Sequence, residues 1–220
     1  MLKKERFRRF IDYFTLHYPE PQTELIFGNP YELLVAVILS AQCTDKRINQ
    51  VTPALFARFP EPESLAAASV DEVLTFIRSV SYPNNKAKHL VGMGKVLMER
   101  FGGEIPATVE ELQLLPGVGR KTAHVILSVV YNQPTMAVDT HVFRVSHRLG
   151  LATLTATTPL AVERALMAHI PKKYVYKSHH WLILHGRYVC VARSPKCDIC
   201  ALREFCKYCE KSLNQDFKVI

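Results

Sequence analysis

The sequence of 220 residues has no long apolar run. Its longest one, Leu33 to Leu39, is far shorter than the roughly 20 residues that a membrane-spanning helix needs. The basic start, MLKKERFRRF, lacks an uninterrupted apolar segment, and Glu5 and Asp12 are unlike a transit peptide. We therefore expect no membrane association and a cytoplasmic location.

Glycine is also scarce, at 9 residues, proline is present in an ordinary amount, at 13, and no repeat, low-complexity tract or long linker is evident. This composition excludes collagen-like and disordered classes. Strand signals are weak, whereas helix starts recur: Ser69 with Glu72 and Thr108 with Glu111 form capping boxes, and Thr158 precedes a proline. The sequence therefore predicts an all-α protein with short connections.

Apolar spacing and helix punctuation place these elements approximately. The segment 31–41 is apolar on nearly all sides, which predicts a buried central helix. The predicted helices cover about residues 7–18, 31–41, 69–79, 86–101, a short segment after 108, 120–131, a segment from 158, and 174–191.

Acidic residues are in the minority: 20 Asp and Glu face 28 Lys and Arg, for a net charge of +8. The stretch 164–197 has seven basic residues and no acid. Such an excess favours a polyanionic partner, although charge alone does not distinguish nucleic acid from an anionic membrane.

The segment ELQLLPGVGRKT, at 111–122, followed by AHVILSVV, predicts a helix-hairpin-helix. Gly117 and Gly119 permit backbone conformations that let successive N–H groups point outward and bind one phosphate, without reading sequence. A nucleotide P-loop is disfavoured because Arg120 separates Gly119 from Lys121. A plain helix–helix turn with solvated basic residues stays open.

Lys121 and Asp139 are the candidate reactive groups near this hairpin. A lysine in the first turn of a helix lies at the positive end of the dipole, which disfavours its ammonium form and favours an amine nucleophile. Asp139, in MAVDTHVFRV, directly precedes a predicted helix, so it is either an ordinary N-cap or a functional carboxylate.

Five of the six cysteines lie within twenty residues near the C-terminus. In a reducing compartment such a cluster indicates metal ligation before disulfides. The pairs Cys197/Cys200 and Cys206/Cys209 look like zinc knuckles, but their spacer is much shorter than the usual roughly 12 to 20 residues. Four thiolates also suit an iron–sulfur cluster, and spacing alone does not decide.

Several motifs in order resemble the endonuclease III family, DNA glycosylases and AP lyases of the helix-hairpin-helix superfamily that carry a 4Fe-4S cluster. The motifs are ELLVAVILSAQCTD, LPGVGRKTA, AVDTHVFRV, HHWLILHGRYVC and Cys-x6-Cys-x2-Cys-x5-Cys. The resemblance covers nearly the whole chain. It implies two all-α lobes: a six-helix barrel module with the hairpin at 23–133, and a cluster lobe made of 1–22 plus 134–220. DNA is expected in the groove between them.

The resemblance also assigns roles to individual residues. Lys121 falls on the Schiff-base lysine and Asp139 on the catalytic aspartate, while Gln42 falls on the residue that fills the gap left by an extruded nucleotide. The remaining implied residues are the DNA contacts Leu115, Gly117, Val118, Gly119, Arg193 and Lys196 and the cluster ligands Cys190, Cys197, Cys200 and Cys206, with Cys209 as an extra thiol.

One segment departs from the family pattern. Where the family usually has a Gly-Leu-Tyr-like stretch, this chain has SYPNN at 81–85. Tyr82 would occupy the wedge position between bases opposite the lesion, a role open to aromatic side chains, or it is a solvated loop tyrosine. Elsewhere, Cys43 and Trp181 are expected in the core, and the histidines 179, 180 and 185 are expected to pack or contact phosphate rather than bind metal.

The implied function is a bifunctional, monomeric glycosylase and AP lyase of base excision repair. It would remove oxidised pyrimidines from double-stranded DNA at the nucleoid, form a Schiff base and cleave the strand 3' to the abasic site by β-elimination. Two alternatives stay open. One is an adenine-mismatch glycosylase, which normally lacks the lysine and has a further C-terminal domain; the other is a non-enzymatic DNA-binding protein with a structural metal.

Overall fold

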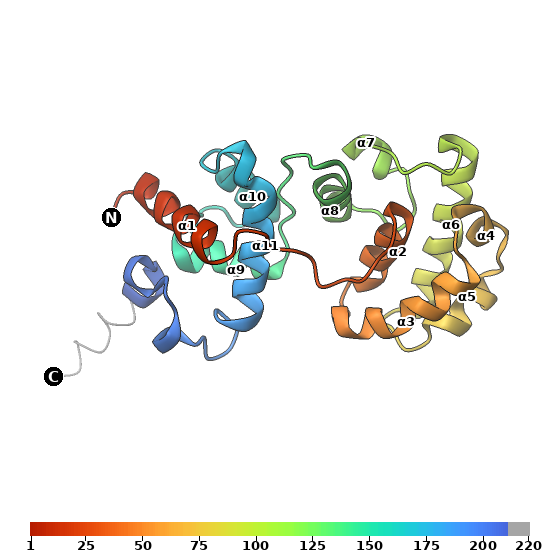
Figure 1. Ribbon diagram of the computed structural model, residues 1–220, viewed down its shortest axis with the longest axis horizontal. Coiled ribbons are helices and arrows are strands. Elements are labelled where there is room, and N and C mark those ends of the chain that lie inside the picture. Colours follow the sequence, from red (N-terminus) through yellow and green to blue (C-terminus); the bar gives the residue numbers. More distant parts are fainter. Residues whose placement is uncertain (211–220) are drawn as a thin grey trace. The chain divides into compact units, whose positions relative to one another are not determined.

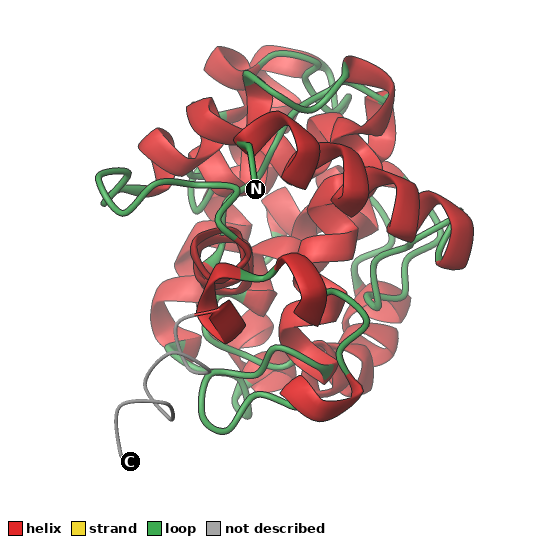
Figure 2. Cartoon of the chain, turned by 90° about the vertical axis from the view of Figure 1, so that its left-hand side faces the viewer, coloured by secondary structure: helices red, strands yellow, loops and turns green. Residues whose placement is uncertain are grey.

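The computed structural model describes residues 1–210, which contain eleven α-helices, two 3-10 helices and no strand (Figures 1 and 2). The chain forms two compact units. We call Thr23–Gln133 the hairpin unit, and Met1–Gln22 together with Pro134–Ile220 the cysteine unit. The expected range of the cluster lobe includes 211–220, which lie outside the described residues. None of the described helices is long and apolar enough to cross a membrane.

The hairpin unit is built around α2 (Pro30–Ser40). Every residue of α2 from Leu33 to Leu39 is buried, which confirms the predicted central helix. It packs against three other helices of the unit. The helices that follow α2 in the chain are α3 (Asp45–Arg58), α4 (Pro62–Ala67), α5 (Val70–Ile77), α6 (Pro83–Phe101), α7 (Val109–Leu112) and α8 (Arg120–Tyr131).

Side-chain caps fix where most of these helices begin. The side-chain oxygens of Ser69 and Thr108 accept hydrogen bonds from the backbone N–H of Glu72 and Glu111, at 3.1 and 3.2 Å, so the hydroxyl half of each predicted capping box is formed. Each cap satisfies one N–H that has no partner within its helix. At the other end of α6, Gly102 takes the left-handed conformation that commonly ends helices.

The helix bounds differ from expectation in several places, and α1 for example begins at Lys3 rather than at residue 7. Helices α3 and α4 were not expected, because α3 contains Pro53 in its interior and α4 has only six residues. Helix α6 begins at Pro83, before the expected residue 86, because proline suits a first helical position. The last long helix, α11, spans Lys172–Tyr188 and so begins and ends earlier than 174–191.

The cysteine unit has a separate aromatic core. Trp181, Phe10 and Phe14 are buried there, with the Phe14 ring stacked on Trp181 at 5.5 Å between centroids. The indole N–H of Trp181 donates to the carbonyl of Tyr18 (2.7 Å), so this residue is part of the core, as predicted. The helices are α1 (Lys3–His17), α9 (Thr140–Leu149), α10 (Pro159–Met167), α11 and the 3-10 helices Cys197–Ile199 and Arg203–Phe205.

Candidate DNA-binding and catalytic site

The two glycines of the hairpin turn meet different structural requirements. Gly117 has a φ of +83°, and a Cβ there would lie 3.0 Å from the Cβ of His89, so both conformation and space require glycine. Gly119 has an ordinary φ of −92°, and a Cβ there would meet nothing within 4 Å. Gly119 therefore leaves open space in front of helix α8 rather than relieving strain.

That open space lies at a helix start suited to an anion. Gly119 is the N-cap of α8 and offers no side-chain cap to the first N–H groups of the helix. Leu115 and Val118 are buried, and the Val118 N–H donates to the Leu115 carbonyl (3.0 Å). Their side chains therefore pack in the core beneath the turn. Only their backbone atoms are left to contact DNA.

Lys121 is an exposed residue in the first turn of α8. Its side chain is exposed to solvent, whereas Ala123, two residues further along the helix, is buried in the core.

Asp139, in the cysteine unit, is the N-cap of α9. One carboxylate oxygen accepts a hydrogen bond from the backbone N–H of Val142 (2.8 Å), and the residue is half-buried. The ordinary capping role is therefore real. A carboxylate has several acceptor positions, so this single bond leaves others free for a ligand. The capping bond also holds the Asp139 side chain in one orientation.

Gln42 and Tyr82 are exposed loop residues of the hairpin unit. Gln42 follows α2 and Tyr82 is the N-cap of α6; both have a φ of +54°. Left-handed backbone is uncommon for residues other than glycine, asparagine and aspartate. Tyr82 is 63% exposed, so its ring is available for contact.

Five cysteines line one pocket of the cysteine unit: Cys190, Cys197, Cys200, Cys206 and Cys209. Burial raises the pKa of the Cys200 thiol, and the neighbouring thiols Cys206, Cys190 and Cys197 also raise it. Burial raises the pKa of Cys209 to about 12, with further contributions from Cys206 and Cys197. The four expected ligands thus face a common space, and the extra thiol faces it too.

The donor set of this pocket fits an iron–sulfur cluster. Within residues 1–210, no three His, Cys, Asp or Glu side chains converge on a point that would hold a single metal ion. A 4Fe-4S cluster is larger than one ion and binds one thiolate at each iron, so its ligands surround a cavity. Cys190, Cys197, Cys200 and Cys206 would supply these thiolates.

Arginine side chains of α9 hold the loop that begins at Cys190. Arg148 donates to the carbonyls of Val191 (2.7 Å) and Ala192 (2.9 Å) and lies 3.5 Å from the Cys190 sulfur. Arg144 donates to the carbonyl of Cys190 (3.2 Å). Burial lowers the pKa of Arg144, and the Arg148 charge adds to this. The two arginines restrain the loop on which Arg193 and Lys196 are exposed.

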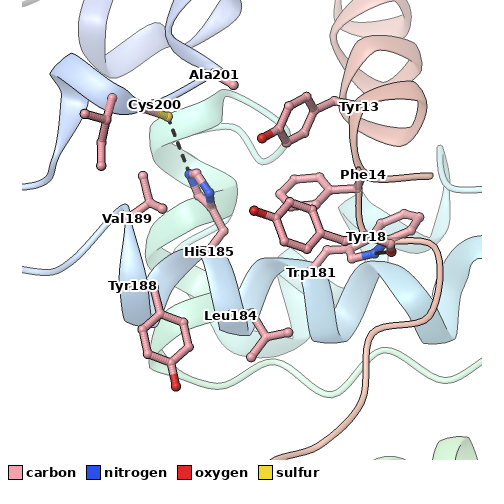
Figure 3. A pocket seen from close by; sticks show the side chains of 11 residues that line it. Tyr13, Phe14, Tyr18, Trp181, Leu184, His185, Tyr188, Val189, Cys200 and Ala201 are labelled. Carbon is pink, nitrogen blue, oxygen red and sulfur yellow. Dashed lines mark hydrogen bonds between the residues drawn. The ribbon is translucent and has the colours of Figure 1, made fainter. Parts of the chain in front are cut away.

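His185 lies between this pocket and an aromatic one (Figure 3). Its Nε2 is 3.7 Å from the Cys200 sulfur, and Phe14 and Trp181 line the aromatic side. Burial lowers the pKa of His185 to about 4 and that of His180 to about 3, the latter with help from His179 and Arg187. These histidines are therefore neutral core groups near neutral pH.

Sequence reasoning assigned no functional role to three residues that the structure places at these sites. Lys86 is buried although it is charged, Arg148 holds the cysteine loop, and Cys209 joins the thiol pocket. The first two act through carbonyls more than forty positions away in the chain. Only the Cys-x2-Cys repeat could have pointed to Cys209.

Comparison with known families places the chain. Residues 35–172 match the model of the HhH-GPD superfamily base excision DNA repair proteins, and residues 190–206 match the iron–sulfur binding domain of endonuclease III. The second match begins at Cys190 and ends at Cys206, so it contains the four expected ligands and leaves out Cys209. It decides for the 4Fe-4S cluster and against the zinc alternative.

Individual proteins agree with both matches. Endonuclease III of Rickettsia conorii is 46% identical over 200 residues, covering 91% of this chain and 94% of that protein. Endonuclease III of Escherichia coli K12 is 42% identical, with coverages of 88% and 90%, and that of Bacillus subtilis is 45% identical, with 88% of each.

Solved structures extend the likeness to three dimensions. A trapped endonuclease III–DNA covalent intermediate has a TM-score of 0.91 and 42% identity, covering 97% of this chain and all of that one. A thermostable thymine-DNA glycosylase, at 20% identity and a TM-score of 0.85, shares the fold. The chain therefore belongs to the endonuclease III family, within the helix-hairpin-helix superfamily of base excision DNA repair proteins.

Proposed function

We propose that this chain removes oxidised pyrimidines from double-stranded DNA, with Lys121 as the nucleophile and Asp139 as the carboxylate that assists it. Family membership already makes it a DNA glycosylase and AP lyase of base excision repair that binds DNA and carries a 4Fe-4S cluster. The proposal adds the substrate class and the residues that carry the chemistry.

The exposed Lys121 at the uncapped start of α8 is the observation that carries the proposal. A related endonuclease III has been trapped as a covalent intermediate with DNA, and such an intermediate requires a nucleophile. In this chain, the amine sits beside a helix start that can bind the DNA phosphate. Phosphate binding there would bring the sugar to the amine without reading the sequence.

The reaction needs the target nucleotide outside the duplex, because stacking buries its sugar C1'. Extrusion costs a few kcal/mol and is least costly for a damaged, poorly stacked base. The neutral amine of Lys121 then forms a bond to C1', and the base leaves with the electrons of the glycosidic bond. Ring opening gives a Schiff base; loss of a C2' proton breaks the bond between C3' and its oxygen and cuts the strand.

Asp139 supplies negative charge to this sequence of steps. As a carboxylate it would stabilise the positive charge that develops on the sugar and accept the proton that leaves the Lys121 ammonium. Its bond to the Val142 N–H holds one oxygen in place. The remaining acceptor positions of the group are the ones that we assign to the reaction.

The cluster and the basic loop would serve binding rather than bond cleavage. Cys190, Cys197, Cys200 and Cys206 would hold the 4Fe-4S cluster, which would fix the loop on which Arg193 and Lys196 are exposed and so place their side chains for phosphate contacts. Gln42 would fill the gap left by the extruded nucleotide, and Tyr82 would separate the bases opposite. We propose that the protein acts as a monomer at the nucleoid in the cytoplasm.

Activity on two defined duplexes tests the substrate class. We expect the protein to cut a duplex with one thymine glycol and to cut the matching duplex with a plain abasic site, both with β-elimination ends. A protein that cuts the abasic duplex but leaves the thymine glycol intact would contradict the assignment of oxidised pyrimidines. Release of adenine from a mismatch without strand cleavage would favour the monofunctional alternative.

A further inference from the structure

The two exposed residues that we assign to base insertion share an unusual backbone. Gln42 and Tyr82 both have a φ of +54°. This conformation costs free energy for a side chain such as tyrosine, and it persists only where the surroundings determine it. The side chain of Tyr82 makes no capping hydrogen bond to α6, so it does not stabilise its own backbone conformation. Something else in the hairpin unit must hold both loops.

Ser81 joins the two loops directly. Its hydroxyl donates to the carbonyl of Gln42 (2.7 Å), and its backbone N–H lies 3.4 Å from the sulfur of Cys43. The contacts thus fall on the residue before Tyr82, on Gln42 itself and on the residue after Gln42. A shift of one loop would break bonds to the other.

Lys86 binds the chain segment just before Gln42. It is only 5% exposed, and its ammonium donates to the carbonyls of Leu39 (2.8 Å) and Ala41 (2.7 Å) at the end of α2. The last turn of α2 has no basic residue of its own, and its final carbonyls lack helical partners. Burial lowers the pKa of Lys86, and the nearby Cys43 opposes this.

We propose that Ser81 and Lys86 form a loop clamp, a pair of positioning residues that present Gln42 and Tyr82 for insertion into duplex DNA at an extruded nucleotide. The proposal rests on the proposed function. Entering a stacked duplex is unfavourable for a loop that must first be ordered, so a clamp that orders both loops in advance lowers the cost of binding. Neither residue needs to contact DNA for this.

A clamp role and a purely structural role predict different effects on duplex and single-stranded substrates. A duplex has stacked bases to separate and a gap to fill, whereas a single strand with an abasic site has neither. Loss of the clamp should therefore slow cleavage of the duplex and leave the single strand nearly unaffected. A general loss of stability would lower both activities together.

The test compares Ser81→Ala with Ser81→Thr, which keeps the hydroxyl. Ser64→Ala is the control, because the Ser64 hydroxyl also donates to a backbone carbonyl of this unit (Glu61, 2.7 Å) far from the two loops in the sequence. Single-turnover cleavage is measured at an abasic site in a duplex and in the same strand alone. We expect Ser81→Ala to lower the duplex-to-single-strand rate ratio about fivefold, and Ser81→Thr and Ser64→Ala to keep it.

Lys86→Met removes two bonds from a charged group and should lower the ratio about tenfold or more. If Lys86→Met does not fold, the comparison of Ser81→Ala with Ser81→Thr tests the clamp, since these two variants differ only by one hydroxyl and one methyl group. As a second readout, 2-aminopurine opposite the abasic site should brighten less with Ser81→Ala than with the wild type, because insertion unstacks that base.

An unchanged ratio and unchanged 2-aminopurine signal in folded Ser81→Ala would overturn the clamp, as would an equal fall on both substrates. These results differ from a failure of the proposed function itself. In that case the wild type would cut neither abasic substrate and form no borohydride-trapped adduct, whatever residue stands at position 81.

Discussion

Asp139 shows how one residue combines a local and a chemical role. Its carboxylate caps α9 through the Val142 N–H at 2.8 Å, and we assign its charge to the sugar. The two roles have different requirements: asparagine caps a helix about as well as aspartate does, but it carries no charge and accepts no proton at neutral pH.

Substitution at this position separates the roles. Asp139→Asn should keep the thermal stability of the wild type and lose most base release, by roughly a hundredfold or more, as expected for removal of an acid–base group. Asp139→Ala should lose the activity and also about 1 kcal/mol of stability. Thermal melting and single-turnover base release measure the two effects. An active Asp139→Asn would restrict this residue to capping.

His180 is the residue whose burial gives a pH dependence of stability. Burial first, then His179 and Arg187, lower its pKa from the ordinary 6.5 to about 3, and the Tyr176 ring packs against it at 5.0 Å. Between pH 6.5 and about 3, His180 is therefore protonated in the unfolded chain and neutral in the folded chain. The free energy of unfolding is therefore unaffected by His180 above pH 6.5 and decreases as the pH falls from 6.5 toward 3.

Urea unfolding of the wild type and of His180→Gln checks this. Between pH 7 and pH 5 the wild type should lose about 2 kcal/mol more of its unfolding free energy than the variant loses. The comparison cancels the titration of other groups common to both. Parallel pH profiles for the two proteins would show that His180 is protonated in the folded state.

At the scale of the element, the hairpin turn separates a structural glycine from a functional one. Gly117→Ala should lose about 1–2 kcal/mol of stability, because alanine is strained at a φ of +83° and its Cβ would press on His89. Gly119→Ala has no such conflict, yet it places a methyl group in the space that we assign to a DNA phosphate.

We therefore expect Gly119→Ala to be folded with DNA affinity lowered about tenfold, while Gly117→Ala is measurably less stable. Fluorescence anisotropy with an abasic-site analogue and thermal melting make the comparison. Wild-type affinity in Gly119→Ala would show that the start of α8 does not approach the phosphate backbone.

The elements also show what sequence reasoning could reach. Helix α8 was expected at 120–131 and spans Arg120–Tyr131, because the glycine turn and an apolar face mark it locally. Helix α3 has an internal proline, Pro53, that masks the local signal, and tertiary packing maintains the helix nevertheless. Local chemistry thus predicts a helix such as α8, whose start and apolar face are marked in the sequence, and it misses α3, which has a Thr44 cap but also an internal proline.

The site divides in the same way. Lys121, Asp139 and the four proposed ligand cysteines stand in short sequence motifs with recognisable spacing, so the sequence alone could propose them. The clamp joins Lys86 to carbonyls 45 and 47 positions away, and no local pattern records that pairing. The burial of Leu115 and Val118 likewise depends on the fold of the whole unit.

At the scale of the whole molecule, we propose that the cluster fixes the loop that begins at Cys190, together with the bonds from Arg144 and Arg148. Cys206→Ser should lose the visible absorption of the cluster and most of the DNA affinity, since the loop with Arg193 and Lys196 loses a fixed point. Cys209→Ser is the matched control, because its thiol lines the same pocket but lies outside the family's ligand segment.

Absorption spectra, iron content and DNA affinity of the two purified variants provide the measurement. Cys209→Ser should keep all three close to wild type. Loss of iron from Cys209→Ser together with retention in Cys206→Ser would show that the ligand set includes Cys209 in place of Cys206.

The central claim is that Lys121 forms the covalent bond to DNA. Borohydride trapping on a duplex with one abasic site tests it most directly, with Lys121→Gln compared with Lys95→Gln, a substitution of another exposed lysine of the hairpin unit. We predict a trapped protein–DNA adduct for the wild type and for Lys95→Gln, and none for Lys121→Gln although it still binds the duplex. A trapped adduct of Lys121→Gln at the wild-type level would contradict the account.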